Sequence, residues 1–599
     1  MATQTGRGSP HLRLRIGFLL IAMVLSLFGA RLLQLQGFDP YSYAAAARKS
    51  SLVDVVLPAT RGDILDRNGE PLATSVDGLM VVANPQATRK VAPQLAKLLA
   101  NKLDIDYADT LEALRGKDHD GVAAEDSQFE YVARRVPAAL ATEAVTAAED
   151  LGYKGLSTQR DPARDYPGGT LAANLIGFVG IDESLGGIER SFDKTLAGKD
   201  GKATYVVSGG RKLPLSPSST VAPVDGQDIT LTIDRGLQYY AYRALAQAVT
   251  SSGASSGAVI VLDAKTDETL ALVDYPTFDA NDPAASKKKD RGSRALSDVY
   301  EPGSVQKVLT LSALMDADKA ITPRTKLVVP NELDRQDRPI HDWFVHPTDK
   351  MRWTLAGVVA QSSNIGTVLA ADRFESGQLR DYLAKFGLGE KTGVGLSGES
   401  PGILPSGTAW TDQVEDRVDF GQSVSVNALQ EAVAINTVAN GGVKVTPSLI
   451  KGSATNDAGE TVGTDEATST RVIGQKAATQ MMKMMERVVD PATGTAPKAQ
   501  VAGYRVAGKT GTAQRVNAKC KCYDGSVTVS FAGFAPADDP RFTVYVVIQD
   551  PKTNRGGGSN AGPVFSRVMA YALRHFGVES TGTEASHLPV EWGPGALTY

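Results

Sequence analysis

A single apolar run near the N-terminus limits what this chain can become. Residues Ile16–Ala30 carry no charge, and three leucines extend the run past Arg31 to Leu35. The uncharged stretch alone is shorter than the ~20 residues that span a bilayer. Extension to Leu35, with the Arg31 guanidinium reaching the interface, gives a sufficient length. No later segment is long and apolar enough to span, so we predict one transmembrane anchor, over residues 16–36.

The charges beside this run predict which side of the membrane each end occupies. Residues 1–15 carry three arginines and no acidic residue, so this tail should stay cytoplasmic. Everything after residue 37 should then lie outside the cytoplasmic membrane. A cleaved signal peptide, with a cut site at Ala44-Ala45-Ala46, and a buried core helix are the alternatives. We therefore predict a single-pass protein of the cell membrane whose bulk is extracytoplasmic.

Composition excludes several classes of protein. A net charge of −4 and a pI near 6.0 give no basic field for nucleic acid. Two cysteines in 599 residues exclude a disulfide framework and a four-thiolate zinc site. Six scattered histidines without an HExxH pattern leave little material for a metal site, and no cofactor is predicted. A globular protein of two to four domains remains.

The sequence pattern indicates a mixed α+β fold in two extracytoplasmic parts. The first, residues 37–225, mixes short strands with Ala-rich helices and ends in a boundary rich in Gly, Pro and Ser at 209–227. Its clearest elements are a strand at Leu52–Leu57, a hairpin turn at Asp66-Arg67-Asn68-Gly69, and helices at Ala92–Asn101 and Pro137–Leu151.

The second part covers residues 226–577, and residues 578–599 are predicted to be a flexible tail. A helix capped by Asp234 opens this part. Its remaining elements are two strand pairs and a late helix, at Ala258–Asp263 with Thr269–Tyr275, Thr528–Phe534 with Phe542–Gln549, and Val564–His575.

Three short motifs in the second part suggest nucleophilic chemistry. In the first, Pro302-Gly303-Ser304 opens an apolar helical segment, Val305–Ala317, with Gly303 as its N-cap. Ser304 would lie in the first turn, where backbone N–H groups and the helix dipole favour negative charge. Lys307, three residues on, would share its face, and an unprotonated lysine could activate the serine. The alternative for this motif alone is an ordinary surface Ser and Lys.

The second motif is Ser362-Ser363-Asn364, inside the segment Thr354–Ala371. Ser362 could relay a proton between Lys307 and a leaving amine, and Asn364 could orient Lys307 and a substrate carbonyl. These polar residues could equally form a helix cap before the apolar residues that follow. For this motif alone the capping interpretation is favoured.

The third motif, Lys509-Thr510-Gly511-Thr512, follows a short β-like stretch. On a strand that edges a cleft, Gly511 would let a substrate backbone approach closely. Lys509 would supply positive charge, and the two threonines hydrogen bonds, for an anionic substrate end. The N–H groups of Ser304 and Thr512 could form an oxyanion hole. An ordinary exposed strand end is the alternative.

Two other segments imitate functional motifs. Lys391-Thr392-Gly393 repeats the tripeptide of the third motif, but it lies in a Gly-rich stretch that predicts a loop. Gly503–Thr510 (GYRVAGKT) matches the nucleotide-binding pattern G-x-x-x-x-G-K-[ST]. A P-loop needs an irregular loop inside and a helix that begins at the lysine. Here the interior is predicted to be a strand, and Gly511 disfavours a helix, so no nucleotide site is predicted.

The three motifs, in this order, resemble the active-site set of penicillin-binding proteins and serine β-lactamases. Further segments extend the resemblance over nearly the whole chain, and class B penicillin-binding proteins of the division-type FtsI group look closest. These segments are Arg31–Gln36 (RLLQLQ), Arg61–Gly69 (RGDILDRNG), Gly187-Ile188-Glu189, Leu231–Asp234 (LTID), Phe420-Gly421-Gln422 and Ser530–Gly533 (SFAG). No glycosyltransferase domain fits before residue 225, which argues against a bifunctional class A enzyme.

The resemblance implies an elongated mixed pedestal, or dimerisation, domain at 37–225. It implies a penicillin-binding, serine β-lactamase-like transpeptidase domain at 226–577, in which helices flank an antiparallel sheet. The implied activity is that of a peptidoglycan D,D-transpeptidase. Ser304 would attack the penultimate D-alanine carbonyl of a stem peptide, release the terminal D-alanine and pass the acyl group to the amine of a neighbouring stem.

Roles are carried over position by position: Lys307 as general base, Ser362 and Asn364 for proton relay and positioning, and Lys509, Thr510, Gly511 and Thr512 for substrate binding. β-Lactams would acylate Ser304 because their amide mimics the D-Ala-D-Ala bond. The implied partners are an FtsW-type lipid II polymerase and other membrane proteins of the divisome. The alternatives are an elongation-type class B transpeptidase, a hydrolase on the same site, and a non-catalytic sensor or scaffold.

Two features lie outside the pattern of the resemblance. Cys520-Lys521-Cys522 follows the third motif in a basic loop. Its two cysteines could form a strained disulfide or remain free thiols. His341 and His346 lie close enough in sequence to suggest a metal site, but two ligands without a third favour packing within a loop.

Overall fold

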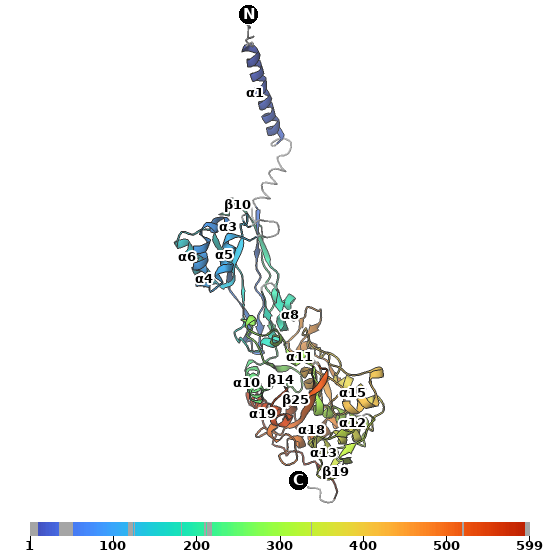
Figure 1. Cartoon of the computed structure of the whole chain (residues 1–599). Helices are drawn as coiled ribbons and strands as arrows, with labels where there is room; N and C mark the ends of the chain where they lie inside the picture. Colours follow the sequence, from blue (N-terminus) through green and yellow to red (C-terminus); the bar gives the residue numbers. More distant parts are fainter. Residues whose placement is uncertain are drawn as a thin grey trace. The chain divides into compact units, whose positions relative to one another are not determined.

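The computed structural model describes residues 10–34, 52–117, 124, 126–180, 183–208, 211–212, 219–336, 338–517 and 520–593. These residues form two compact units (Figure 1). The N-terminal unit takes its described residues from 1–59 and 199–225. The main unit takes its described residues from 60–198 and 226–599.

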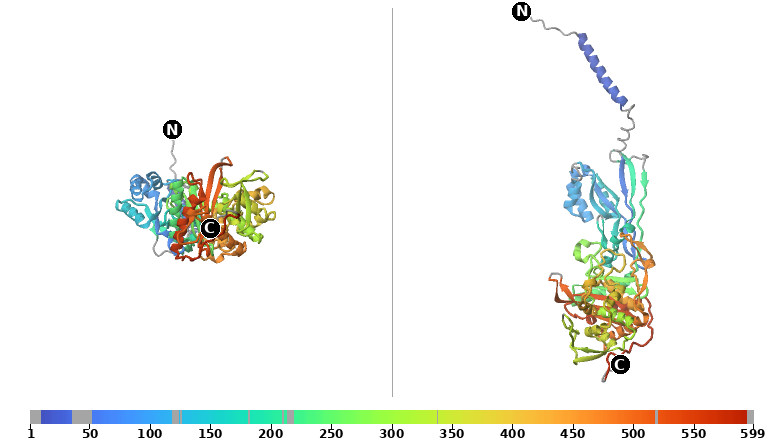
Figure 2. Two further views of the ribbon diagram at one scale, coloured as in Figure 1. Left: turned by 90° about the horizontal axis from the view of Figure 1, so that it is seen from below. Right: turned by 90° about the vertical axis from the view of Figure 1, so that its right-hand side faces the viewer.

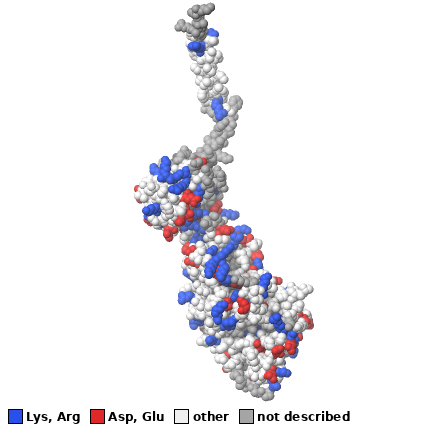
Figure 3. Space-filling model, viewed as in Figure 1, with Lys and Arg blue, Asp and Glu red and all other residues white. Residues whose placement is uncertain are grey.

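The N-terminal unit contains the apolar helix α1, Pro10–Leu33. At 1.5 Å per residue, this 24-residue helix is about 36 Å long, which is enough to cross a hydrocarbon core of ~30 Å. In Figure 3 it is almost free of charge between basic side chains near its two ends. The helix starts six residues before the predicted anchor. The proposed cut site at Ala44-Ala45-Ala46 lies outside the described residues.

A four-stranded sheet completes the described part of the N-terminal unit. Strand β10 is its centre and pairs antiparallel with three others. The strands are β1 (Leu52–Leu57), β10 (Gly201–Ser208), β11 (Arg211–Lys212) and β12 (Ser219–Val221). Strand β1 confirms the predicted strand with the same bounds. Part of the predicted boundary at 209–227 forms β11 and β12, because β10 offers hydrogen-bonding partners to this otherwise turn-rich stretch.

The first part of the main unit, residues 60–198 with β13, holds two sheets and several short helices. Its strands are β2 (Ile64–Leu65), β3 (Pro71–Val76), β4 (Gly78–Ala83), β5 (Glu130–Pro137), β6 (Leu156–Arg160), β7 (Ala163–Asp165), β8 (Phe178–Val179), β9 (Ser184–Leu185) and β13 (Ile229–Thr230). Its helices are α3 (Pro85–Thr88), η2 (Arg89–Val91), α4 (Ala92–Leu103), α5 (Tyr107–Arg115), α6 (Ala138–Asp150), α7 (Ala173–Ile176), α8 (Gly187–Ser191) and α9 (Asp193–Ala197).

One sheet, β5-β4-β6, packs against α4 and α6 around a small separate core that includes Val81, Leu95 and Leu99. The other sheet has the order β13-β2-β3-β7. Its β2–β3 hairpin turns at the predicted Asp66–Gly69, where Asp66 Oδ1 accepts the N–H of Asn68 over 2.8 Å. Strand β13 runs parallel to β2, so a segment beyond residue 225 completes a sheet that begins near residue 64.

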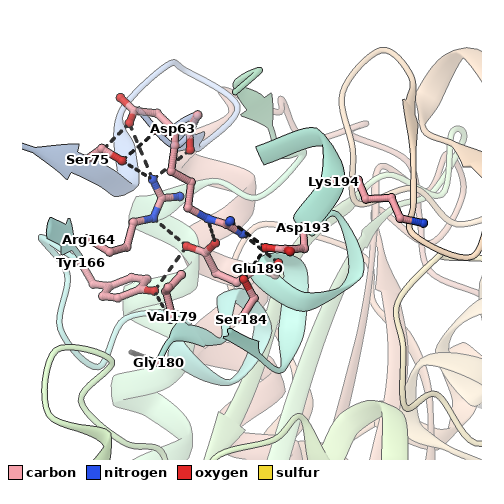
Figure 4. Close-up of polar contacts among 12 residues, drawn as sticks. Asp63, Ser75, Arg164, Tyr166, Val179, Gly180, Ser184, Glu189, Asp193 and Lys194 are labelled. Atoms are coloured by element: carbon pink, nitrogen blue, oxygen red, sulfur yellow. Dashed lines mark hydrogen bonds and ion pairs between the residues drawn. The ribbon is translucent and has the colours of Figure 1, made fainter. Parts of the chain in front are cut away.

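A buried ion cluster ties the segments of this part together (Figure 4). Glu189, with no exposed side-chain surface, accepts Arg61 Nε over 2.6 Å and Arg164 Nε over 2.7 Å. The hydroxyl of Tyr166 donates to the same carboxylate over 3.3 Å. Arg61 also pairs with Asp193 over 2.7 Å. Arg61 and Glu189 come from two motifs of the family resemblance, which the fold therefore brings into contact.

The second part of the main unit begins with α10 and contains the remaining elements. Its longer helices are α10 (Arg235–Ser252), α12 (Gln306–Ala317), α13 (Leu355–Gln361), α14 (Asn364–Ala371), α15 (Gln378–Phe386), α16 (Asp412–Val418), α17 (Ala428–Ala439), α18 (Gln475–Val489) and α19 (Gly557–His575). Its short helices are η3 (Pro283–Ala285), η4 (Lys288–Asp290), α11 (Arg294–Ser297), η5 (Gly303–Val305), η6 (Gly407–Ala409), η7 (Thr464–Glu466) and η8 (Pro497–Ala499).

A five-stranded antiparallel sheet forms the centre of this part, in the order β15-β14-β26-β25-β24. The strands are β14 (Ser256–Asp263), β15 (Thr269–Tyr275), β24 (Ala507–Asn517), β25 (Cys522–Ala535) and β26 (Phe542–Gln549). Short strands pair outside it: β16 (Lys326–Pro330) with β19 (Lys350–Thr354), β17 (Glu332–Leu333) with β18 (Ile340–His341), β20 (Val443–Val445) with β23 (Ser469–Arg471), and β21 (Ala454–Thr455) with β22 (Thr461–Val462).

Every residue of β14 and β26 is buried, which shows that both faces of the central sheet are covered. Helices α10 and α19 pack together on the sheet, and α12, α17 and α18 form a second group. The β24–β25 hairpin extends past β26, whose pairing with β25 begins at Thr528, and it projects from the sheet (Figure 2). The sheet flanked by helices confirms the predicted fold class.

The structure changes two details of the predicted elements. Strand β24 begins at Ala507, so the preceding Tyr504-Arg505-Val506 lies outside it. Residues 578–593 contain no helix, but they are not a loose tail. Val590 is buried, and its carbonyl accepts the N–H of Thr354 over 3.0 Å. Apolar side chains near the end of the tail pack against the domain. The Gly and Pro content of the segment gives no indication of this packing.

Candidate active site

Ser304 lies in the short helix η5, directly before the buried helix α12. Gly303, predicted to be the N-cap, belongs to η5 itself and has a φ of +58°. Its N–H donates to the carbonyl of Gly421 over 3.0 Å. A Cβ atom at Gly421 would lie 2.1 Å from the carbonyl oxygen of Gly303. The turn that carries Ser304 is therefore in backbone contact with the loop after α16.

Lys307 is fully buried on the first turn of α12. Its Nζ donates to the carbonyl of Ser362 and to Oδ1 of Asn364, both over 2.7 Å. Burial lowers the pKa of Lys307 to about 7, while the charge of Asp342 opposes this shift. A neutral amine has two hydrogens and one lone pair. The two short bonds use both hydrogens, so the lone pair of a neutral Lys307 is free to accept a proton.

The second motif forms the corner between α13 and α14. Ser362 ends α13 with a φ of +59°, and Ser363 caps α14 by accepting the N–H of Gly366 over 2.8 Å. The capping interpretation therefore holds for one residue of this motif. Ser363 is the helix cap, while Ser362 and Asn364 contact Lys307.

Lys509 reaches the same corner from strand β24. Its Nζ donates to Ser362 Oγ over 2.8 Å and to the carbonyl of Thr510 over 3.1 Å. Burial and the neighbouring Lys307 amine both lower the pKa of Lys509. The cluster therefore disfavours two positive charges at once, and Ser362 connects the two lysines.

Asp342 anchors this corner from the loop after β18, and we did not predict it. Its carboxylate accepts the hydroxyl of Ser363 over 2.8 Å and the N–H of Asn364 over 2.5 Å. His346 contacts the same carboxylate over 2.8 Å. His346 therefore packs within its loop as predicted. The sequence signal for this carboxylate is its place in HDWFVH, between His341 and His346.

These residues border a cleft of about 510 Å³, a size typical of ligand sites. Its lining residues are Ser304, Trp343, Ser362, Asn364, Thr495, Thr510, Thr512, Arg555, Gly556, Gly557, Gly558 and Ser559. Five of the eight predicted site residues lie in this lining, while Lys307 and Lys509 are buried at its base. Trp343, Thr495, Arg555 and the start of α19 escaped prediction, because only the tertiary fold brings these loops to the cleft.

Gly511, the eighth predicted residue, lies where β24 passes the turn that carries Ser304. A Cβ atom there would lie 2.2 Å from Ser530 Oγ and 3.0 Å from the carbonyl oxygen of Pro302. Ser304, in turn, follows Pro302 by two residues. The close packing of β24 against η5 thus depends on the absence of a side chain at Gly511.

The other sequence features have simple structural outcomes. Lys391-Thr392-Gly393 lies in a loop. Lys509 lies within a strand, and no helix begins there, so the GYRVAGKT match is not a P-loop. Cys520 and Cys522 form a disulfide at the tip of the β24–β25 hairpin. Within the described ranges, no group of three or more His, Cys, Asp or Glu residues is arranged to hold a metal ion.

A serine at the start of a buried helix, a neighbouring lysine with a lowered pKa and a lysine-bearing strand edge are the features expected of a serine acyl-transfer site. Family comparison agrees with this class. Residues 257–570 match the penicillin binding protein transpeptidase domain, and residues 56–231 match the penicillin-binding protein dimerisation domain. The chain belongs to the penicillin-binding proteins, in the class B group that combines these two domains.

Relatives cover nearly the whole chain. Penicillin-binding protein PbpB of Mycolicibacterium smegmatis is 34% identical over 94% of this chain and 90% of its own. Peptidoglycan D,D-transpeptidase FtsI of Escherichia coli is 30% identical over 93% and 91%. A crystal structure of penicillin binding protein 3 from Mycobacterium tuberculosis, complexed with aztreonam, has a TM-score of 0.68 and 30% identity over 90% of this chain and 100% of that one.

Proposed function

We propose that Ser304 is the nucleophile of a peptidoglycan D,D-transpeptidase that cross-links stem peptides at the division septum. The class of enzyme, a class B peptidoglycan D,D-transpeptidase, follows from the family. The observation that carries the residue assignment is the pair of 2.7 Å bonds from Lys307 to Ser362 and Asn364. These bonds orient a base whose pKa is near neutrality, where general-base catalysis is efficient.

In the acylation step, Ser304 Oγ attacks the carbonyl carbon of the penultimate D-alanine and gives its proton to Lys307. The N–H groups of Ser304 and Thr512 stabilise the resulting oxyanion. Collapse breaks the C–N bond, and the terminal D-alanine leaves as an amine after it receives a proton through Ser362. An ester between Ser304 and the donor stem remains. In the free structure the Ser304 hydroxyl makes no hydrogen bond to Lys307, and such contacts often form only when substrate binds.

The cluster around Lys509 supports its role in substrate binding. A substrate carboxylate beside Lys509 would favour the charged ammonium, and Thr510 and Thr512 would donate hydrogen bonds to it. In the second step, the side-chain amine of a neighbouring stem attacks the ester carbonyl and gives a proton to the neutral Lys307. The C–O bond to Ser304 then breaks, and Lys307 returns a proton to Oγ, which leaves the new amide and a free Ser304 hydroxyl. A hydrolase would use water in this step, so a long-lived acyl-enzyme would separate the two reactions.

The septal role and the membrane partners rest on similarity to FtsI. The apolar helix α1 supports a single-pass anchor with a cytoplasmic tail, because its N-terminal end carries arginines and no acid. An FtsW-type lipid II polymerase and other divisome proteins are the proposed partners. Depletion in the native host tests this role, because a septal enzyme predicts filaments. Rounded cells would favour the elongation-type alternative.

Labelling by a fluorescent penicillin tests the nucleophile. The full chain in detergent should form one covalent adduct that persists for hours in intact-mass spectra, and Ser304→Ala should form none. Ser297→Ala is a matched control, because Ser297 is exposed at the end of α11 and does not line the cleft. Rapid loss of the adduct would favour a hydrolase. Labelling of Ser304→Ala would refute the assignment.

A further inference from the structure

A second cavity, larger than the cleft, lies between helices α10 and α19. Its volume is about 630 Å³. The α10 side contributes one helical stripe that includes Tyr240, Arg243, Gln247 and Thr250, at spacings of three and four residues. Arg567 closes it from α19. We call this cavity the α10–α19 groove. None of the predicted site residues lies in it.

The groove has an uncompensated positive charge. Neither α10 nor α19 contains an Asp or Glu residue. Arg243 donates to the hydroxyl of Tyr239 over 3.2 Å, and within the described part of the chain no carboxylate lies within 4 Å of Arg243 or Arg567. Two guanidinium groups without an acid beside them create a local field that attracts anions.

Arg567 is held in a fixed position in the groove. Its Nη1 donates to Gln247 Oε1 over 2.7 Å, and its Nη2 donates to the carbonyl of Ala244 over 3.2 Å. Its Nε is buried and has no hydrogen-bond partner among the described residues. A buried donor of this kind costs free energy unless a ligand or water satisfies it. Arg567 is therefore fixed in the wall of an open groove, in which Arg243, Gln247 and Thr250 are exposed to solvent.

Helix α19 connects the groove to the active-site cleft. Gly557, at the start of α19, lines the cleft, and Arg567 lines the groove ten residues later. At 1.5 Å per residue, this separation is about 15 Å along the helix. A polymer with repeated anionic groups could therefore occupy both places at once.

We propose that the α10–α19 groove binds a carboxylate of the peptidoglycan strand, at a second site on the polymer that the cleft processes. The assignment rests on the proposed function, because stem peptides supply carboxylates along such a strand. The flat fork of a guanidinium matches a carboxylate. The exposed Arg243 offers such a fork, and Arg567, which donates to Gln247 and Ala244, adds positive charge beside it. An acidic segment of a partner protein is the competing occupant.

The test uses the full chain in detergent, with Ser304 first acylated by benzylpenicillin so that the cleft is blocked. Failure of that acylation would refute the proposed function and is detected separately. The probe is a soluble, uncross-linked glycan fragment that carries tetrapeptide stems, and binding is measured by calorimetry. We expect binding that weakens about tenfold or more in Arg243→Glu and recovers only in part in Arg243→Lys, which keeps the charge but lacks the fork.

Arg574→Glu is the matched control, because Arg574 is exposed on α19 and does not line the groove. It should bind the fragment as the wild type does. Inorganic phosphate is the second probe, and competition by phosphate but not by acetate would assign the groove to a phosphate-bearing ligand instead. Unchanged binding by Arg243→Glu, or no binding by the acylated wild type, would overturn the proposal. Binding of an acidic peptide but not of the fragment would favour a protein partner.

Discussion

The amine of Lys307 lies 2.7 Å from the carbonyl oxygen of Ser362, so the first two motifs meet through a backbone atom. The serine hydroxyl is 3.5 Å from the same amine and 2.8 Å from Lys509. Ser362, at a helix corner, therefore contacts two buried lysines, whose positive charges would repel each other. The protonation state of this cluster should control the reactivity of Ser304.

The first prediction concerns the pH dependence of acylation. Lys307 must be neutral to accept the proton of Ser304, and its pKa is about 7. The rate of labelling by a fluorescent penicillin should therefore rise as pH increases through about 7 and then level off. Lys307→Arg stays charged at every pH and should lower the rate by roughly 10²–10⁴-fold. Stopped-flow fluorescence between pH 5 and 9 measures both.

Lys319→Arg is a suitable control, because Lys319 is exposed just after the C-terminal end of α12, while Lys307 lies at its N-terminal end. It should keep the wild-type profile. A wild-type rate that is flat from pH 5 to 9 would contradict the assignment of Lys307 as the base.

The second prediction concerns Asp342, which positions Ser363 and Asn364 and raises the pKa of Lys307 by its charge. Asp342→Asn removes this charge, so the pKa of Lys307 should fall. The acidic limb of the rate profile should then move to lower pH, while the maximal rate falls because Asn364 is less well fixed. A purely structural role would lower the rate without moving the limb.

Asp349→Asn is the matched control for this variant, because Asp349 is exposed in the same loop. Both proteins are compared by stopped-flow labelling and by thermal unfolding. Asp342→Asn should lose roughly 1–3 kcal/mol of stability, since its buried carboxylate accepts several hydrogen bonds. A limb that moves to higher pH would refute the electrostatic argument.

The site motifs could be predicted from sequence because each one forms its own local geometry. Lys307 follows Ser304 by one helical turn, and Ser362 precedes Asn364 at a helix corner. Their order along the chain then indicated one site. Asp342 could not be assigned in this way, because its contacts depend on where a long loop folds back on α14.

The errors in the predicted fold have a similar physical origin. Tyr504-Arg505-Val506 has the composition of a strand, yet it lies outside β24, which begins at Ala507. The side chain of Arg505 instead pairs with Glu486 over 2.7 Å. The Gly and Pro content of the tail predicts a flexible segment, but Trp592 donates to the carbonyl of Leu327 over 3.0 Å. In both segments a tertiary contact outweighs the local preference.

The third prediction concerns the buried ion cluster of the first part of the main unit. Glu189→Gln leaves Arg61 and Arg164 without the carboxylate that they share. Breaking a buried pair costs roughly 3–5 kcal/mol, so the unfolding midpoint should fall by about 5 °C or more. The labelling rate of the folded protein should stay unchanged, because the cluster does not line the cleft.

Glu183→Gln is the matched control, because Glu183 is 68% exposed and lies 3.7 Å from the exposed Arg190. Surface pairs contribute about 1 kcal/mol or less, so its midpoint should move by only about 2 °C. Differential scanning fluorimetry compares the three proteins. Equal midpoints for Glu189→Gln and the wild type would show that the cluster adds no stability.

The last prediction separates steric contact from backbone strain at the nucleophile turn. Gly421 has a φ of +89°, and a Cβ atom there would lie 2.1 Å from the carbonyl oxygen of Gly303. Gly421→Ala must therefore push the turn that carries Ser304 away from its place, and a displacement of 1 Å costs roughly 10²-fold in rate. Gly398 has a similar φ of +87° with no atom within 4 Å.

Gly398→Ala thus introduces the same backbone strain, about 1 kcal/mol, without a clash. It should label with penicillin at the wild-type rate, while Gly421→Ala should label about 100-fold more slowly although it stays folded by circular dichroism. If both variants label normally, the backbone contact does not position Ser304. If both are equally slow, strain rather than steric contact is the cause, and the catalytic turn depends on the stability of the whole domain.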